Sequence, residues 1–188
     1  LVLSFTKWDL IVRPTFVGFA NFQNALHDET FRKVVFNTVY YTLGTVPSGM
    51  VLALILALAL NQKLRGVTWF RTVYYLPVVS SIVAVAMVWR WLYNRDFGLV
   101  NWVLSLAGIE PVGWLTSTKW AMPAVIIMSI WKGLGYNMII FLAGLQGIPQ
   151  HLYEAAAVDG ASSWRRFWSI TLPMLSPTTF FVLVISII

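Results

Sequence analysis

Lys132 is a single cation inside a long apolar stretch, and this position indicates a functional environment. On insertion scales a charged side chain near the centre of a membrane span costs about 2.5–3.5 kcal/mol, so Lys132 is expected to face protein or water. The residues that follow it are small or polar, at Gly133, Gly135, Tyr136 and Asn137. A tyrosine can stack on a polar solute, and an asparagine amide can bond hydroxyl groups. The segment is therefore a candidate lining for a solute path.

The same residues also fit a structural role, and both interpretations stay open. Lys132 can extend its ammonium group to the membrane surface or pair with a carboxylate of a partner subunit. Tyr136 and Asn137 can then join helices by hydrogen bonds inside the bilayer. The glycines serve either role, because a missing side chain lets a ligand or a neighbouring helix approach the backbone.

A second stretch, from Glu154 to Pro177, reads EAAAVDGASSWRRFWSITLPMLSP and changes from polar to apolar along its length. Its Ala-rich beginning favours a helix. Asp159-Gly160 predicts a turn, because glycine tolerates positive φ and aspartate can bond its own backbone. Ser162 or Ser163 can cap a second helix. The pattern predicts a polar helix–turn–helix directly beside a membrane segment.

The spacing of this stretch resembles the EAA loop of binding-protein-dependent ABC transporter permeases, above all the sugar and glycerol-phosphate importers. The matching elements are Glu154-Ala155-Ala156, Asp159-Gly160 and Ile170-x-Leu172-Pro173. In that family the loop is a cytoplasmic coupling helix that docks in a cleft on the ATP-hydrolysing subunit. The resemblance thus implies these coupling residues: Glu154, Ala155, Ala156, Asp159, Gly160, Leu172 and Pro173. Without the resemblance, Glu154 could equally be a charge on the surface of a helix, and Gly160 could be a helix C-cap.

Further expectations come with the resemblance. Sugar-type permeases have a segment similar to WKGLGYNM that contributes to the translocation path, which here corresponds to residues 131–138. The expected partners are ABC ATPase subunits, a second homologous permease subunit and an extracytoplasmic solute-binding protein. The chain itself is expected to need no cofactor, because the partner ATPase binds the ATP.

Composition independently indicates a membrane protein. The chain is 59% hydrophobic and only 11% charged, with a mean hydropathy of +0.74. A soluble domain of this length needs more charge to cover its surface. The net charge of +6 is scattered between apolar runs, which favours contact with the bilayer rather than with nucleic acid. Cysteine is absent and only His27 and His151 supply imidazoles, so no metal site is expected.

The hydropathy pattern predicts an all-α integral membrane fold, and the resemblance implies a multi-span helical bundle of the ABC importer permease type. We expect one transmembrane domain over 1–188, truncated at both ends. Short helices are expected near 21–26 and over 99–109, the second amphipathic and lying on the outer surface. The predicted spans are 1–5 (the tail of a span), 34–60, 72–92, 120–146 and 170–188 (the start of a span), with the coupling loop at 147–172.

Orientation follows from the resemblance and not from charge counting. With the coupling loop in the cytoplasm, five basic residues lie inside and seven outside, which the positive-inside rule does not favour. The inside group is Lys63, Arg65, Arg71, Arg165 and Arg166.

The absence of catalytic motifs bounds the function. No G-x-x-x-x-G-K-[ST], H-E-x-x-H or G-x-S-x-G sequence occurs, and no acid–base carboxylate pair lies in a span, so no catalytic residue is assigned. The sequence therefore predicts a transport subunit rather than an enzyme. The resemblance implies that it carries a carbohydrate-type solute across a bacterial or archaeal plasma membrane, with ATP hydrolysed by a separate protein. The alternative is a secondary transporter or channel driven by an ion gradient, but 34–60, 72–92 and 120–146 contain no Asp or Glu for an ion site.

Overall fold

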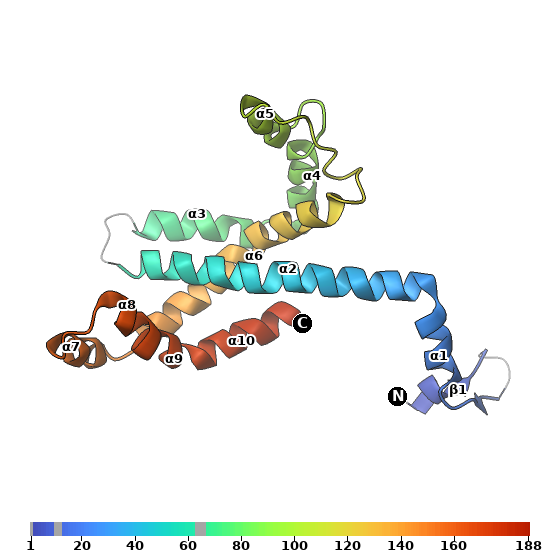
Figure 1. Ribbon diagram of the computed structural model, residues 1–188, viewed down its shortest axis with the longest axis horizontal. Coiled ribbons are helices and arrows are strands. Elements are labelled where there is room, and N and C mark those ends of the chain that lie inside the picture. Colours follow the sequence, from blue (N-terminus) through green and yellow to red (C-terminus); the bar gives the residue numbers. More distant parts are fainter. Residues whose placement is uncertain (1, 10–12, 63–66) are drawn as a thin grey trace. The chain divides into compact units, whose positions relative to one another are not determined.

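A computed structural model describes residues 2–9, 13–62 and 67–188, and most of these residues are helical (Figure 1). The chain forms two compact units, Leu1–Thr42 and Leu43–Ile188, where the sequence suggested one domain. The boundary falls inside one long helix, α2 (Glu29–Leu60), which continues through Pro47. Lys63 and Arg65, which entered the count of basic residues, lie outside the described residues.

The first unit is small and held together by aromatic rings. It contains the 3₁₀ helix η1 (Val2–Phe5), the paired strands β1 (Thr6–Lys7) and β2 (Thr15–Phe16), and helix α1 (Ala20–His27). Phe5 packs against Phe19, the residue before α1, and against Phe22 within α1, with ring centroids 5.4 and 5.3 Å away. Residues 2–5, expected as the tail of a membrane span, therefore form a short 3₁₀ helix that packs against α1. Helix α1 includes the short helix expected near 21–26.

The second unit is a set of helices around α6 (Ala121–Gln146). Both α3 and α10 pack against α6, and α2 meets it through small side chains. The other elements of this unit are α3 (Val67–Val79), α4 (Ile82–Leu92), α5 (Leu99–Leu106), α7 (Gln150–Val158), α8 (Ser163–Arg166), the π-helix η2 (Phe167–Thr171), α9 (Leu172–Met174) and α10 (Ser176–Ile187).

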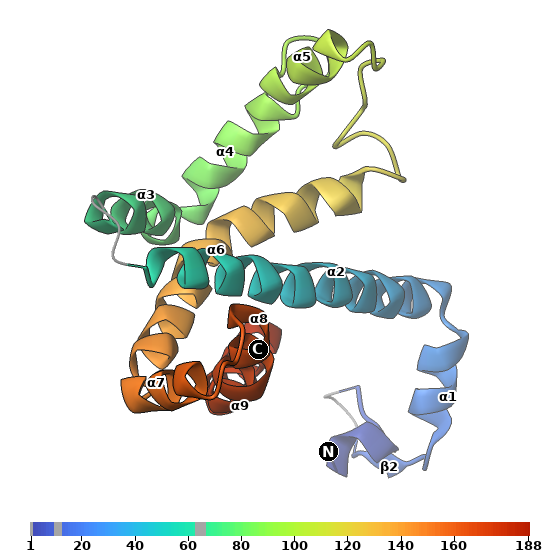
Figure 2. The ribbon, with the colours of Figure 1, turned by 60° about the vertical axis from the view of Figure 1, so that its left-hand side comes forward.

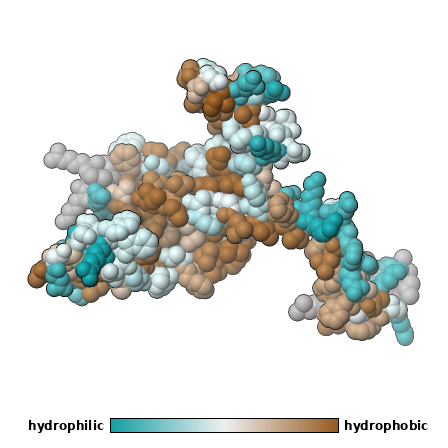
Figure 3. Space-filling view, viewed as in Figure 1, coloured by the Kyte–Doolittle hydropathy of each residue, from teal (hydrophilic) through white to brown (hydrophobic). Residues whose placement is uncertain are grey.

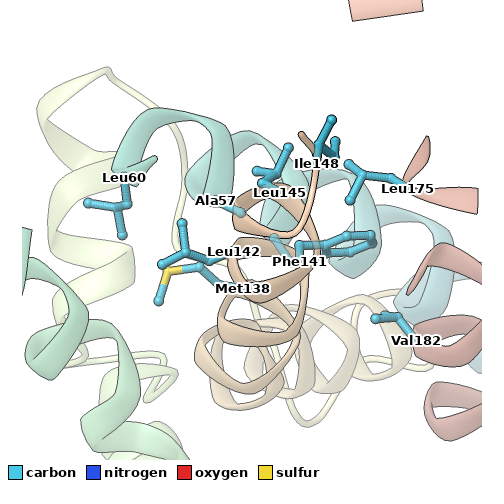
Figure 4. Packing of buried hydrophobic residues seen from close by; sticks show 10 residues of the cluster. Ala57, Leu60, Met138, Phe141, Leu142, Leu145, Ile148, Leu175 and Val182 are labelled. Carbon is cyan, nitrogen blue, oxygen red and sulfur yellow. The ribbon is translucent and has the colours of Figure 1, made fainter. Parts of the chain in front are cut away.

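One cluster of buried side chains joins α2, α6 and the C-terminal helices (Figure 4). Ala53 and Ala57 lie one turn apart on α2, and neither exposes any surface. In lipid, helices gain little from hydrophobic burial and associate through close packing, which small residues permit. The cluster consists of Ala53, Ala57, Leu60, Met138, Phe141, Leu142, Leu145, Ile148, Leu175 and Val182.

Two helices, α2 and α6, are long and apolar enough to cross a membrane, judged by length and composition. Two further stretches qualify only as bent pairs. Trp69–Val79 and Ile82–Leu92 meet at 101°, and Ser163–Met174 and Ser176–Ile187 meet at 62°. The expected range 34–60 thus lies within α2 and 120–146 falls on α6, while 72–92 contains a sharp corner between α3 and α4 (Figure 2).

The α3–α4 corner is fixed by two contacts with α6. A Cβ added at Gly135 would overlap the carbonyl oxygen of Tyr74, so the backbones of α3 and α6 touch at this glycine. The ammonium of Lys132 donates to the carbonyl oxygens of Pro77 and Ser80, at 3.2 and 3.1 Å. Carbonyls at the end of a helix lack intrahelical partners, and a cation there also interacts well with the helix dipole.

The segment after α4 folds around one buried amide. The Asn101 oxygen accepts from Val112 N at 3.1 Å and from Trp114 Nε1 at 3.0 Å, and its amide nitrogen donates to Val112 O at 2.9 Å. Tyr93 donates to the carbonyl oxygen of Ala124 at 3.0 Å. Burial raises the pKa of Tyr93 to about 12, which keeps the donated proton in place. The Asn101 bonds attach α5, at the place of the helix expected over 99–109, to the segment before α6, and the Tyr93 bond attaches the end of α4 to the start of α6.

We predict that Gly135→Ala destabilises the protein, because the new methyl group meets the backbone of α3. Overpacking of this kind costs about 1–3 kcal/mol. Gly133→Ala is the matched control, since nothing lies within 4 Å of its added Cβ. The control gains helix propensity, up to about 1 kcal/mol. Thermal unfolding in detergent should show a lower Tm for Gly135→Ala alone, and equal Tm values for the two variants would refute the close contact.

We predict that Lys132→Met loosens the α3–α4 corner. It removes two hydrogen bonds to a charged donor, each contributing about 1.5–3 kcal/mol, although loss of the buried charge offsets part of this. Lys132→Arg retains donors and charge and is expected to stay near wild type. Spin-label distances between α4 and α6 should broaden in Lys132→Met only. An unchanged distance distribution would show that Lys132 does not hold the corner.

Candidate functional site

The segment 132–137 presents two faces with different neighbours. Lys132 and Gly135 face α3, as the contacts with Pro77, Ser80 and Tyr74 show. Gly133, Tyr136 and Asn137 instead line a cavity of about 210 Å³ between α2, α6 and α10. The structure therefore brings three of the five residues of the expected solute path to one cavity and places the other two in a helix contact.

The cavity is lined by uncharged residues, several of which carry hydrogen-bonding groups. The Asn137 amide donates to Ser186 Oγ of α10 at 3.4 Å. Thr45 Oγ1 of α2 is buried and has no hydrogen-bond partner among the residues that the structure describes. Ser129 adds a further hydroxyl from α6. The remaining lining residues are Val46, Gly49, Ile130, Leu134 and Ile185.

This arrangement suits a small neutral polyhydroxyl group. Hydroxyls and an amide both donate and accept, which matches the hydroxyl groups of a sugar. Tyr136 is 42% exposed, and its aromatic ring can cover an apolar face of a sugar ring. The volume is below the usual range of about 300–1,000 Å³ for small-molecule sites, so the cavity holds one small ring or part of a larger solute.

Sequence reasoning missed Thr45, Ser129 and Ser186. Each is a small hydroxyl residue in an apolar helix, and such residues commonly bond their own backbone or a neighbouring helix. Nothing in their spacing along the chain separates them from packing residues. Only the approach of α2, α6 and α10 brings them together around Asn137.

The predicted coupling segment forms the expected helix–turn–helix. Helix α7 ends at Val158, and Gly160 has a φ of 74°, in the left-handed region that favours glycine. The N–H of Gly160 donates to Ala157 O, which ends the helix by the usual C-terminal pattern. Ser162 caps α8 by accepting from Arg165 N at 3.3 Å.

Helix α7 has one face on the bundle and one face free. Leu152 and Tyr153 pack against the buried cluster, and the Tyr153 hydroxyl bonds Thr171 Oγ1 at 2.9 Å. Thr171 is 5% exposed and belongs to η2. Neither residue was predicted from the sequence, because their bond depends on how α7 folds back onto η2. The opposite face exposes Glu154.

The predicted coupling residues fall into two groups. Glu154, Ala155, Asp159 and Gly160 are exposed on α7 and its turn, and Ala156 is half-buried beside them. Leu172 and Pro173 lie in α9, after the π-helix, where Leu172 N donates to Phe167 O. Leu172 and Pro173 belong to the apolar C-terminal stretch and not to the exposed face of α7. Within 2–9, 13–62 and 67–188, no three His, Asp or Glu side chains are grouped to hold a metal ion.

Comparison with known proteins identifies the family. Residues 49–188 match the family described as "Binding-protein-dependent transport system inner membrane component". The chain is 39% identical over 175 residues to the trehalose/maltose transport system permease protein of Thermococcus litoralis, which covers 93% of this chain and 59% of that protein. It is 43% identical over 176 residues to the lactose transport system permease protein of Rhizobium radiobacter, and this match covers 92% of this chain and 59% of that protein.

A solved structure has the same fold. In the crystal structure of a bacterial alginate ABC transporter in complex with an alginate pentasaccharide-bound periplasmic protein, one chain is 34% identical and superposes with a TM-score of 0.80. The match covers 90% of this chain and 59% of that chain. This chain thus spans about 60% of the length of the proteins it matches. It belongs to the inner membrane components of binding-protein-dependent transport systems.

Proposed function

We propose that this chain is a membrane-spanning permease subunit of an ATP-driven ABC importer that translocates a carbohydrate-type solute. One observation supports this most strongly. The exposed α7 turn carries the Glu-Ala-Ala and Asp-Gly pattern on one side and is bonded to the helix bundle through Tyr153 on the other. Such an element can receive a force outside the membrane and pass it to the helices.

The coupling segment is linked to the cavity through η2, α9 and α10. Tyr153 bonds Thr171, the last residue of η2, from which the chain leads through α9 and a 62° bend into α10. Ser186 of α10 lines the cavity and accepts from Asn137 of α6. A shift of α7 that is passed to α10 changes the spacing of these two polar side chains. In this proposal, docking of α7 on a separate ATPase subunit thereby links ATP hydrolysis to the solute cavity.

The uncharged cavity favours a neutral sugar over an anion. Relatives of this chain bear the names of trehalose, maltose and lactose transport systems. Lys132 does not argue for an anionic solute, because its ammonium already donates to two carbonyls of the α3–α4 corner. A secondary transporter driven by an ion gradient is disfavoured, since the cavity lining offers no carboxylate to bind a cation or proton.

The proposal includes the partners and the location. ABC ATPase subunits dock at α7 in the cytoplasm, and a second homologous permease subunit completes the pathway. A solute-binding protein delivers the sugar from outside, as the periplasmic protein in the alginate transporter complex suggests. In this proposal the protein lies in a bacterial or archaeal plasma membrane, which agrees with its family of inner membrane components.

We predict that Gly160→Asp uncouples transport while the helices stay folded. An aspartate in the left-handed region costs roughly 1–2 kcal/mol, and its charge lies in the docking turn. We expect ATP-driven sugar uptake in proteoliposomes of the complete transporter to fall about tenfold or more, an increase in barrier of about 1.4 kcal/mol. Helicity, measured by circular dichroism, should not change.

Gly108→Asp is the matched control for backbone strain. Gly108 has a φ of 73°, and both glycines have nothing within 4 Å of an added Cβ. This control should keep normal uptake, because Gly108 lies after α5 and away from the coupling segment. Normal uptake by Gly160→Asp, or the absence of any co-purifying ATPase subunit from the wild-type complex, would contradict the proposal.

A further inference from the structure

A second cavity, of about 280 Å³, lies between the coupling turn and the helix that follows it. Its polar side chains are two arginines, one carboxylate and one hydroxyl, so its lining carries a net positive charge. Figure 3 shows hydrophilic residues over α7 and α8, next to hydrophobic surface. The lining residues are Ala156, Asp159, Ala161, Arg165, Arg166, Ser169 and Ile170.

The two cations of this notch lack an anionic partner. Arg166 donates through Nη2 to Ser163 Oγ at 3.1 Å, while its Nε is buried without a hydrogen-bond partner among the described residues. Among the residues that the structure describes, no carboxylate oxygen lies within 4.0 Å of a guanidinium nitrogen of Arg165 or Arg166. Asp159 therefore lines the notch without neutralising it. Adjacent guanidinium groups with free donors are the usual recognition element for a phosphate.

The notch also lies where the chain changes from polar to apolar. Trp164 and Trp168 flank the arginines, are 70% and 51% exposed, and contact each other with ring centroids 5.6 Å apart. The segment Ser163–Met174 forms, with Ser176–Ile187, one of the bent pairs apolar enough for a membrane. Tryptophan is enriched at the level of lipid headgroups, and arginine extends to that level from a helix end.

We propose that this notch binds the headgroup phosphate of an anionic phospholipid. Arg165 and Arg166 donate to the phosphate oxygens, and Trp164 and Trp168 lie beside the headgroup at the membrane–water boundary. The exposed tryptophans favour a lipid over an acidic side chain of a protein partner, because aromatic belts are characteristic of the lipid interface. The notch shares Ala156 and Asp159 with the coupling segment but does not include Glu154, and a lipid bound here does not depend on the proposed transport function.

We predict that the purified protein prefers an anionic lipid and loses that preference without the two arginines. Native mass spectrometry in detergent can follow binding of the first phosphatidylglycerol and, separately, of phosphatidylcholine. In Arg165→Gln/Arg166→Gln the dissociation constant for phosphatidylglycerol should rise about 30-fold, from about fivefold for each removed cation. Phosphatidylcholine binding should not change.

Two matched variants test whether the effect is specific. Arg32→Gln/Lys33→Gln removes another adjacent basic pair, exposed on α2, and should keep the lipid preference. Arg165→Lys/Arg166→Lys keeps the charge and should bind within a few-fold of wild type, which separates loss of charge from loss of fold. Equal losses in the Arg32/Lys33 variant, or an unchanged affinity in Arg165→Gln/Arg166→Gln, would overturn the site.

Two further arms identify the occupant. Inorganic phosphate at millimolar concentration should not displace phosphatidylglycerol, because it lacks the chains and headgroup that contact the tryptophans; full displacement would show an unspecific anion site. In the assembled transporter, the lipid should stay bound beside the ATPase subunit. If the arginine variants lose the ATPase subunit while lipid binding is intact, the notch serves a protein carboxylate and the lipid assignment is wrong.

Discussion

Backbone contact between α3 and α6, at Gly135 against the carbonyl of Tyr74, is the constraint on which the second unit depends. It brings the end of α3 within reach of Lys132, whose ammonium takes up two carbonyls at the corner. One face of α6 is thereby used for helix packing. The opposite face, with Gly133 and Asn137, is left for α2, α10 and the polar cavity between them. In lipid, this division rests on shape and hydrogen bonds, because the surrounding chains are as apolar as the side chains.

Much of the helical structure could be predicted from the sequence. Long apolar runs mark α2 and α6, and apolar residues at helical spacing mark α5, because these signals are local. The turn at Asp159-Gly160 and the cap at Ser162 were also predictable, since backbone geometry selects those residue types. All-α membrane architecture follows from the same local signals.

The remaining features depend on tertiary contacts. The hydropathy pattern predicts one continuous span over 72–92. The structure instead has a 101° corner between α3 and α4, and Lys132, more than fifty residues further along the chain, holds it by two hydrogen bonds. From the sequence, Lys132 and Gly135 fit either a solute path or a helix contact, because the sequence does not tell which face of the helix meets α3. The bond between Tyr153 and Thr171 likewise joins residues whose separate types suggest only packing. The hydroxyls of Thr45, Ser129 and Ser186 become a site only when three helices meet.

The opposite roles of the two faces of α6 can be measured directly, because residues 1–188 contain no cysteine and a single introduced cysteine is the one thiol among them. Cysteines at Ser129, Gly133 and Asn137 should react with a water-soluble thiol reagent in the reconstituted transporter. Trehalose, maltose or lactose should slow the reaction at these positions. A cysteine at Met138, which is fully buried against the core, should stay unreactive. Equal reactivity at Asn137 and Met138, or no protection by any of the sugars, would contradict a solute path on this face.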